Sequence, residues 1–147
     1  MDEPVLVPVG QETLPSLEAM VRAYHREDGL TFGRRQAHAL KVLAEHDSSG
    51  LAWLVCQADA TIGYVVLSLG FSIESGGRDG FIDELYVVPS ARGRGVGAKV
   101  LALVEQEARG RGLRKLYLEV QRGNRAKALY GRTGFIDHQN HLMSKPL

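Results

Sequence analysis

The chain has 147 residues, of which 44% are hydrophobic and 24% charged, proportions typical of one globular domain. No apolar run approaches the roughly 18 residues that a membrane span requires, and the first residues lack the basic start and apolar stretch of a signal peptide. The only cysteine, Cys56, excludes an internal disulfide and a zinc site built from several cysteines of one chain. We therefore expect a cytoplasmic protein that binds neither a membrane nor a metal.

Apolar periodicity predicts the elements of the first part of the chain. The predicted elements are a strand at Val5–Val9, helices at Glu12–Tyr24 and Arg34–Glu45, and strands at Leu51–Gln57, Thr61–Phe71 and Gly80–Val88. Short links between the last three strands predict an antiparallel meander.

The second part of the chain predicts helices and strands in alternation. The expected elements are a helix from Val96 to Gly110, a strand at Leu116–Val120, a short helix at Asn124–Gly131 and a final strand at Phe135–Met143. The fold class is therefore α+β, with a central mixed, mostly antiparallel sheet flanked by helices and a C-terminal β-α-β unit.

Charge is distributed unevenly, although the net charge is only +1. Residues 1–91 carry 13 acidic and 6 basic residues, a net charge of −7, whereas residues 92–147 carry 4 acidic and 12 basic residues, a net charge of +8. Solvated helix faces can produce such a bias by chance. The alternative is one site with an anionic ligand on its basic side and a cationic ligand on its acidic side.

A turn rich in glycine and arginine, Arg92-Gly93-Arg94-Gly95-Val96-Gly97, lies between a strand and a helix. Glycines let a ligand approach the backbone, and the free N–H groups and dipole of a helix start attract an anion such as pyrophosphate. A P-loop is excluded because Gly-Lys-Ser/Thr is absent. A dinucleotide fingerprint, a nucleic-acid contact and a turn without a ligand are the alternatives. The near-neutral chain and its few aromatic residues after residue 90 argue against nucleic acid.

Two motifs together resemble the signatures of the GNAT superfamily of N-acetyltransferases. Residues 92–97 fit Arg/Gln-x-x-Gly-x-Gly/Ala, and residues 126–135, Ala-Lys-Ala-Leu-Tyr-Gly-Arg-Thr-Gly-Phe, fit Ala-x-x-Leu-Tyr-x-x-x-Gly-Phe. They occur in the expected order, with a helix and a strand between them. The resemblance implies a GNAT-like fold, a single N-acetyltransferase domain over residues 1–147, acetyl-CoA as the donor and, because many members dimerise, a homodimer.

The resemblance also implies how acetyl-CoA binds. The pantetheine arm pairs with one strand, and the amides of Gly93–Ala98 hold the pyrophosphate. The expected cofactor-binding residues are Leu85, Tyr86, Val87, Arg92, Gly93, Arg94, Gly95, Val96, Gly97, Ala98, Asn124 and Lys127. Members of the family often have asparagine where this chain has Gly123, so a cofactor contact from Asn124 is left open.

Acyl transfer to an amine requires a base for the ammonium, donors for the oxyanion and an acid for the thiolate. The resemblance assigns the acid to Tyr130, which is otherwise a core tyrosine, and we expect the oxyanion donor to be a backbone N–H near Val87. Asp83 and Glu84 are adjacent on a strand and are expected to face opposite sides of it, with Ile82 on the side of Glu84. Either can accept the proton or hold a cationic amine; Glu84 is favoured as the base and Asp83 as the substrate-positioning residue.

The acceptor is expected to be a small cationic amine, such as a diamine, a polyamine or an aminoglycoside-like compound. The acidic first part of the chain favours a cationic partner but does not name one. The sequence Ile-Asp-Glu-Leu at 82–85 resembles diamine and polyamine acetyltransferases. Family placement adds His25, Asp28 and Phe32 to the acceptor site. The alternatives are transfer to a protein N-terminus or lysine, and a non-catalytic acyl-CoA-binding domain.

Overall fold

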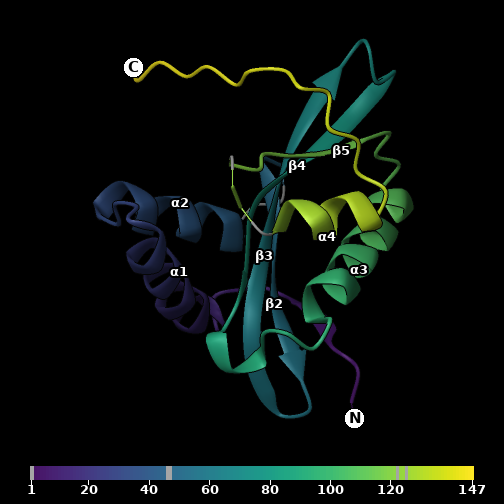
Figure 1. Ribbon diagram of the computed structural model, residues 1–147. Helices are drawn as coiled ribbons and strands as arrows, with labels where there is room; N and C mark the ends of the chain where they lie inside the picture. Colours follow the sequence, from purple (N-terminus) through teal and green to yellow (C-terminus); the bar gives the residue numbers. More distant parts are fainter. Residues whose placement is uncertain (1, 46–47, 122, 125) are drawn as a thin grey trace.

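The computed structural model describes residues 2–45, 48–121, 123–124 and 126–147. It contains a five-stranded sheet between two layers of helices (Figure 1). The strands are β1 (Val5–Pro8), β2 (Gly50–Gln57), β3 (Ala60–Ser72), β4 (Gly77–Val87) and β5 (Leu116–Leu118). The helices are α1 (Leu14–Asp28), α2 (Arg34–Glu45), the 3₁₀ turn η1 (Pro89–Ala91), α3 (Val96–Gly110) and α4 (Ala126–Arg132).

The strands lie in the order β1-β2-β3-β4-β5. The first three pairs are antiparallel, and the β4–β5 pair, joined through α3, is parallel. The predicted α+β class, the meander and the β-α-β unit are therefore confirmed. Within the described part of the chain, no helix is long and apolar enough to cross a membrane, and no group of three metal-ligating side chains is present.

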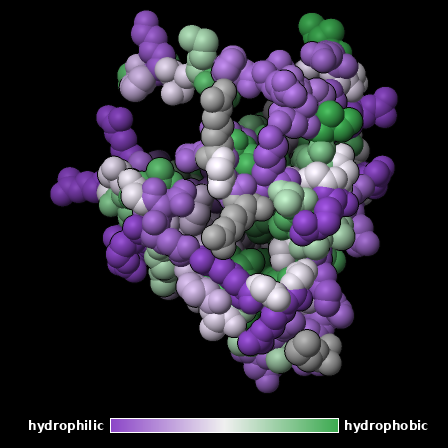
Figure 2. Space-filling view, in the orientation of Figure 1, coloured by the Kyte–Doolittle hydropathy of each residue, from purple (hydrophilic) through white to green (hydrophobic). Residues whose placement is uncertain are grey.

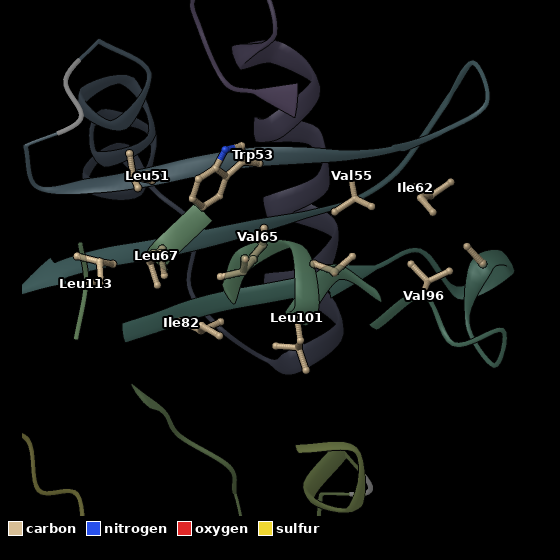
Figure 3. Close-up of a cluster of buried hydrophobic side chains, with 14 residues drawn as sticks. Leu51, Trp53, Val55, Ile62, Val65, Leu67, Ile82, Val96, Leu101 and Leu113 are labelled. Carbon is tan, nitrogen blue, oxygen red and sulfur yellow. The ribbon is translucent and has the colours of Figure 1, made fainter. Parts of the chain in front are cut away.

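Side chains on the two faces of the sheet form two cores. On one face Trp53, Val65 and Leu67 pack against α3 (Figure 3). On the other face Leu54 and Tyr64 pack against α1 and α2. This alternation follows from the two-residue period of a strand, and it gives each helix layer its own apolar surface to cover.

A bulge interrupts this alternation in β4. Val66 pairs with Glu84, whereas the next residue of β3, Leu67, pairs with Ile82, so Asp83 is an extra residue. Ile82 consequently lies in the core beneath α3, while the Glu84 side chain contacts α1. The expectation that these two side chains share a face is wrong, because a one-residue bulge inverts the alternation beyond it.

The C-terminal part of the chain also differs from expectation. The strand predicted at Phe135–Met143 is absent from the described residues, and β5 ends at Leu118. The backbone N–H of Gln139 donates to the Asp137 carboxylate at 2.8 Å, and Gln139 has φ of 57°. This local turn breaks an extended conformation.

Two predicted helices have different limits. The first helix continues beyond Tyr24 to Asp28 and is followed by Gly29 in the left-handed conformation, a usual helix stop. The short helix predicted at Asn124–Gly131 is observed as α4; Arg125, within that prediction, lies outside the described residues.

Candidate active site

The sheet opens at the C-terminal half of β4. β5 pairs with β4 only at Gly80–Ile82, and beyond Ile82 no strand of the described residues borders this edge of β4. The helices α1 and α2 lie on one side of the opening and α3 and α4 on the other (Figure 1). Apolar surface is visible in the hollow between these two halves (Figure 2).

The backbone of β4 has groups that face this opening. The N–H of Val88 donates to a β3 carbonyl at 2.9 Å, and the Tyr86 carbonyl lies against Gly63 of β3. Because backbone groups of successive strand residues point to opposite edges, those of Leu85 and Val87 face the opening. They are oriented to pair with another extended chain.

The turn after β4 exposes backbone amides. Gly93 and Gly95 have φ of 76° and 77°, a region that favours glycine, and a Cβ atom on either would meet no atom within 4 Å. The first helical bond of α3 joins the Lys99 N–H to the Gly95 carbonyl at 3.2 Å. The amides of residues 96–98 therefore precede the helical hydrogen bonds, and they form an anion site next to open space. Arg94 is exposed beside this turn.

Arg92 joins the turn to α1. Its two Nη atoms donate to the two carboxylate oxygens of Glu27 at 2.8 and 2.9 Å, and its Nε donates to the Val87 carbonyl at 2.8 Å. Its guanidinium also lies 5.5 Å from the centre of the Tyr86 ring. The hydrogen bonds lower the pKa of Glu27 and raise that of Arg92. Three of the five guanidinium N–H groups thus bind within the protein, and a phosphate contact from Arg92 stays a prediction.

Three other predicted cofactor-binding residues have partners within the protein. A Cβ atom on Gly97 would lie 3.1 Å from Leu129 Cδ2, so glycine here allows α3 and α4 to approach closely. Asn124 Oδ1 accepts a hydrogen bond from the first amide of α4 at 2.8 Å. Lys127 pairs with Asp137 at 2.9 Å. Their contacts with a cofactor stay predictions.

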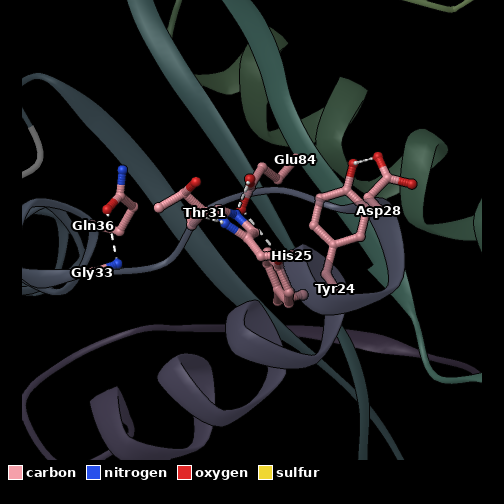
Figure 4. Close-up of polar contacts among 8 residues, drawn as sticks. Tyr24, His25, Asp28, Thr31, Gly33, Gln36 and Glu84 are labelled. Carbon is pink, nitrogen blue, oxygen red and sulfur yellow. Dashed lines mark hydrogen bonds and ion pairs between the residues drawn. The ribbon is translucent and has the colours of Figure 1, made fainter.

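Glu84 is held by two side chains. The distance from its Oε2 to His25 Nε2 is 2.6 Å (Figure 4), and the Tyr64 hydroxyl donates to its Oε1 at 3.0 Å. Desolvation raises the pKa of Glu84, and the hydrogen bonds from His25 and Tyr64 oppose that rise. Asp83 is exposed, yet the surrounding protein desolvates it enough to raise its pKa, an effect that the charge of His25 opposes. The two adjacent carboxylates therefore have different surroundings.

Aromatic side chains surround His25. The His25 ring lies 5.7 Å from that of Tyr24 and 5.9 Å from that of Phe32, edge to face in both pairs. The Tyr24 hydroxyl donates to Asp28 at 3.4 Å, and desolvation, with Asp28 and Glu84 nearby, raises the pKa of Tyr24 to about 12. Of the predicted acceptor-site residues, His25 contacts Glu84, Phe32 packs against His25, and Asp28 is joined to the same group through Tyr24.

Tyr130 lies in α4 on the other side of the opening. Its ring is half-buried and lies 6.0 Å from that of Phe135. Desolvation raises the pKa of Tyr130, and the charge that Tyr130 would carry is one of the influences that raise the pKa of Tyr24. α1 and α4 therefore each bring a phenol to the opening.

Sequence reasoning missed Tyr64, Tyr24 and Glu27. A tyrosine inside the apolar strand β3 is a usable signal, because a buried hydroxyl requires a polar partner. Tyr24 and Glu27 gave no such signal. Glu27 meets Arg92, which is 65 positions away in the sequence.

Comparison with known proteins agrees with this geometry. The sequence matches the Acetyltransferase (GNAT) family over residues 16–135. It is 36% identical over 100 residues to a protein named IAA acetyltransferase from Azospirillum brasilense, with 67% of this chain and 61% of that protein covered. The chain thus spans about three fifths of the length of that relative.

Solved structures share the fold. An integron cassette protein from the mobile metagenome of Cole Harbour Salt Marsh superposes with a TM-score of 0.85 at 32% identity, over 97% of this chain and 90% of that one. AAC(6')-Iy, in complex with the bisubstrate analogue CoA-S-monomethyl-acetylneamine, gives a TM-score of 0.82 at 14% identity, over 99% of both chains. The family match covers most of the sequence, and the chain belongs to the GNAT family of acetyltransferases.

Proposed function

We propose that this chain transfers the acetyl group of acetyl-CoA to a small cationic amine. The observation that carries the proposal is the open edge of β4, which leads directly into a glycine turn and the start of α3. The open edge offers backbone groups to an extended arm, and the turn offers amides to a pyrophosphate. The two features follow one another in the order in which CoA carries these groups.

The residues present fit acetyl-CoA. Leu85 and Val87 direct backbone groups to the opening, and the Val87 carbonyl is already bound by Arg92. Both backbone groups of Leu85 then serve the amides of the pantetheine arm, and the N–H of Val87 serves as the oxyanion donor. Open space above Gly93 and Gly95 accommodates the pyrophosphate. The analogue bound to AAC(6')-Iy joins CoA to an acetylated amine, which supports the same pairing of substrates.

The acidic residues on the α1 side of the opening suit a cationic acceptor. Asp28 and Asp83 are exposed there, and Glu84 lies behind them with His25. A protonated amine gains from negative charge at low dielectric. The diamine or polyamine type and a homodimer, both implied by the family resemblance, stay part of this proposal, together with the cytoplasmic location expected from the sequence.

The amine nitrogen loses two protons in the course of one acyl transfer. Acetyl-CoA supplies an acetyl thioester. A carboxylate of the acidic pair takes one proton from the ammonium, and the amine nitrogen forms a C–N bond to the acetyl carbon as the C–S bond breaks. Tyr130 gives its phenol proton to the sulfur and takes the second proton from the nitrogen, so it ends the cycle protonated. One proton is released per amide formed.

A thiol-release assay tests the proposal. The protein is incubated with acetyl-CoA and putrescine, spermidine, neamine, or a peptide with a free N-terminus and lysine; the control omits the amine. We expect amine-dependent release of free CoA and a mass increase of one acetyl group on a small amine. Acetylation of the peptide alone supports the protein-acceptor alternative. Binding of acetyl-CoA without release supports a non-catalytic domain and contradicts the proposal.

A further inference from the structure

His25 and Glu84 share one proton. His25 Nδ1 lies 3.0 Å from the carbonyl oxygen of Thr31 (Figure 4), and a carbonyl only accepts, so Nδ1 carries a hydrogen. His25 Nε2 then lies 2.6 Å from Glu84 Oε2. Without a hydrogen between them, two lone pairs would face each other at that distance. One proton therefore sits between the two groups, whether as imidazolium with carboxylate or as imidazole with carboxylic acid.

Each carboxylate oxygen of Glu84 already has a hydrogen-bond partner within the protein. Oε2 shares the proton with His25, and Oε1 accepts from Tyr64. A base that takes the proton of an ammonium needs an oxygen that the amine can reach. Asp83, the extra residue of the bulge, is exposed. The bulge thus separates the acidic pair into a held carboxylate and an accessible one.

We propose, on the basis of the proposed function, that His25 and Glu84 form a proton-sharing unit that positions the bulge, and that Asp83 is the carboxylate that binds and deprotonates the acceptor amine. His25 and Glu84 are positioning residues, and Asp83 is the catalytic one. Asp83 takes the first proton of the ammonium, and its exposure lets it release that proton to water before the next turnover. This division reverses the roles that the sequence favoured for the two carboxylates.

The charges around His25 and Glu84 determine how the activity depends on pH. Desolvation raises the pKa of Asp83, and the charge of His25 opposes the rise. Because Asp83 acts as a carboxylate, activity increases as the pH rises through its pKa. Only the imidazolium form of His25 opposes the rise of the Asp83 pKa. Removing His25 removes that positive charge, so the pKa of Asp83 rises further. Tyr64 and Asp83 influence Glu84 directly, and the Tyr24 ring lies beside His25. Asp28 and Tyr130 influence Tyr24, and Tyr86 influences Tyr64.

Nuclear magnetic resonance tests the shared proton without any turnover. A hydrogen bond as short as 2.6 Å between His25 and Glu84 gives a strongly deshielded imidazole proton. We expect this signal in the wild type and its loss in Glu84→Gln, whose amide can donate to Nε2 and accept from Tyr64, so the fold is kept. A wild type without the signal, or a Glu84→Gln variant that retains it, overturns the shared proton.

Kinetics then tests the division of roles. kcat/KM is measured against pH with whichever of putrescine, spermidine and neamine reacts fastest. Asp83→Asn should lower kcat/KM by about 10²–10⁴-fold, the usual contribution of a positioned base, and abolish the fall in activity at low pH. Glu84→Gln should lower kcat/KM by a factor at least tenfold smaller than Asp83→Asn does. Its activity should still fall at low pH. Asp79→Asn, on the same strand but beside Gly70, is the control for a carboxylate outside the site.

The His25 variants complete the test. His25→Gln and His25→Leu should move the fall in activity to higher pH and raise the pKa of the Asp83 carboxyl in an NMR titration. An unmoved or lowered pKa overturns the link between His25 and Asp83. A larger loss in Glu84→Gln than in Asp83→Asn overturns the assigned roles. Absence of turnover with every amine overturns the role of Asp83 together with the proposed function, whereas the imidazole signal still decides the shared proton.

Discussion

The donor side and the acceptor side of the candidate site are built by different means. The donor side uses backbone groups from one stretch of chain, residues 85–98, in which two glycines leave open space. The acceptor side uses side chains from α1, β3 and β4, which pack against one another. We therefore expect the donor side to tolerate changes of side chain but not added volume at its glycines, and the acceptor side to be sensitive to the identity of its side chains.

Tyr130 lies in α4, across the opening from α1, and its substitution carries the largest expected effect. Tyr130→Phe removes only the hydroxyl and keeps the ring contact with Phe135. A positioned general acid contributes about 10²–10⁴-fold, so kcat should fall by that factor. The binding of acetyl-CoA, measured by calorimetry, and the Tm should change little. A stable variant with near-normal kcat would make Tyr130 a packing residue.

The second-largest effect is expected from added volume at a glycine of the donor side. Gly95→Asp places a side chain and a negative charge where the pyrophosphate is proposed to bind, and we expect acetyl-CoA affinity to fall by about 10–100-fold. Gly112→Asp is the matched control, because Gly112 also has φ of 76° and open space but follows the far end of α3. Both variants carry similar backbone strain, so calorimetry isolates the loss at the turn. Equal affinities in the two variants contradict the anion site.

The difference between the donor side and the acceptor side also explains how much of the site could be predicted from the sequence. The glycine turn is local, so its residues and their spacing predicted the strand, turn and helix that the structure contains. The acceptor side depends on contacts between distant segments, as between His25 and Glu84, 59 positions apart. The bulge at Asp83 arises from the register of two strands, and nothing in the local pattern marks it. The prediction of a strand at Phe135–Met143 is wrong because a local turn at Gln139 competes with strand pairing.

Gly97 tests whether a glycine of the motif serves packing instead of ligand approach. Gly97→Ala brings a methyl group to 3.1 Å from Leu129 Cδ2, and α4 must shift by a few tenths of an ångström. Because α4 carries Tyr130, we expect kcat to fall by about three- to tenfold with little change in acetyl-CoA affinity. Leu129→Val removes the opposing Cδ2, so the double variant should recover part of the loss. A fall in affinity without a fall in kcat would return Gly97 to the cofactor cradle.

The smallest effect is expected for the ion pair that joins the donor turn to α1. Arg92 reaches from the donor turn to Glu27 on α1, but both side chains are partly exposed, and such pairs contribute little. Glu27→Gln should raise the KM for acetyl-CoA by about threefold or less. Glu18→Gln, which removes an exposed pair with Arg22 on the same helix, is the control and should leave KM unchanged.

The lowered pKa of Glu27 determines the pH range over which this tie, the Arg92–Glu27 ion pair, is present. The hydrogen bond from Arg92 lowers the pKa of Glu27 below its ordinary value, so the tie is fully present above that ordinary value and is lost as the pH falls through the lowered pKa. The KM of Glu27→Gln and of the wild type should therefore converge under acid conditions, where Glu27 is protonated, and differ most near neutral pH. A lower KM in Glu27→Gln than in the wild type near neutral pH would mean that Arg92 meets the phosphates directly once Glu27 no longer holds it.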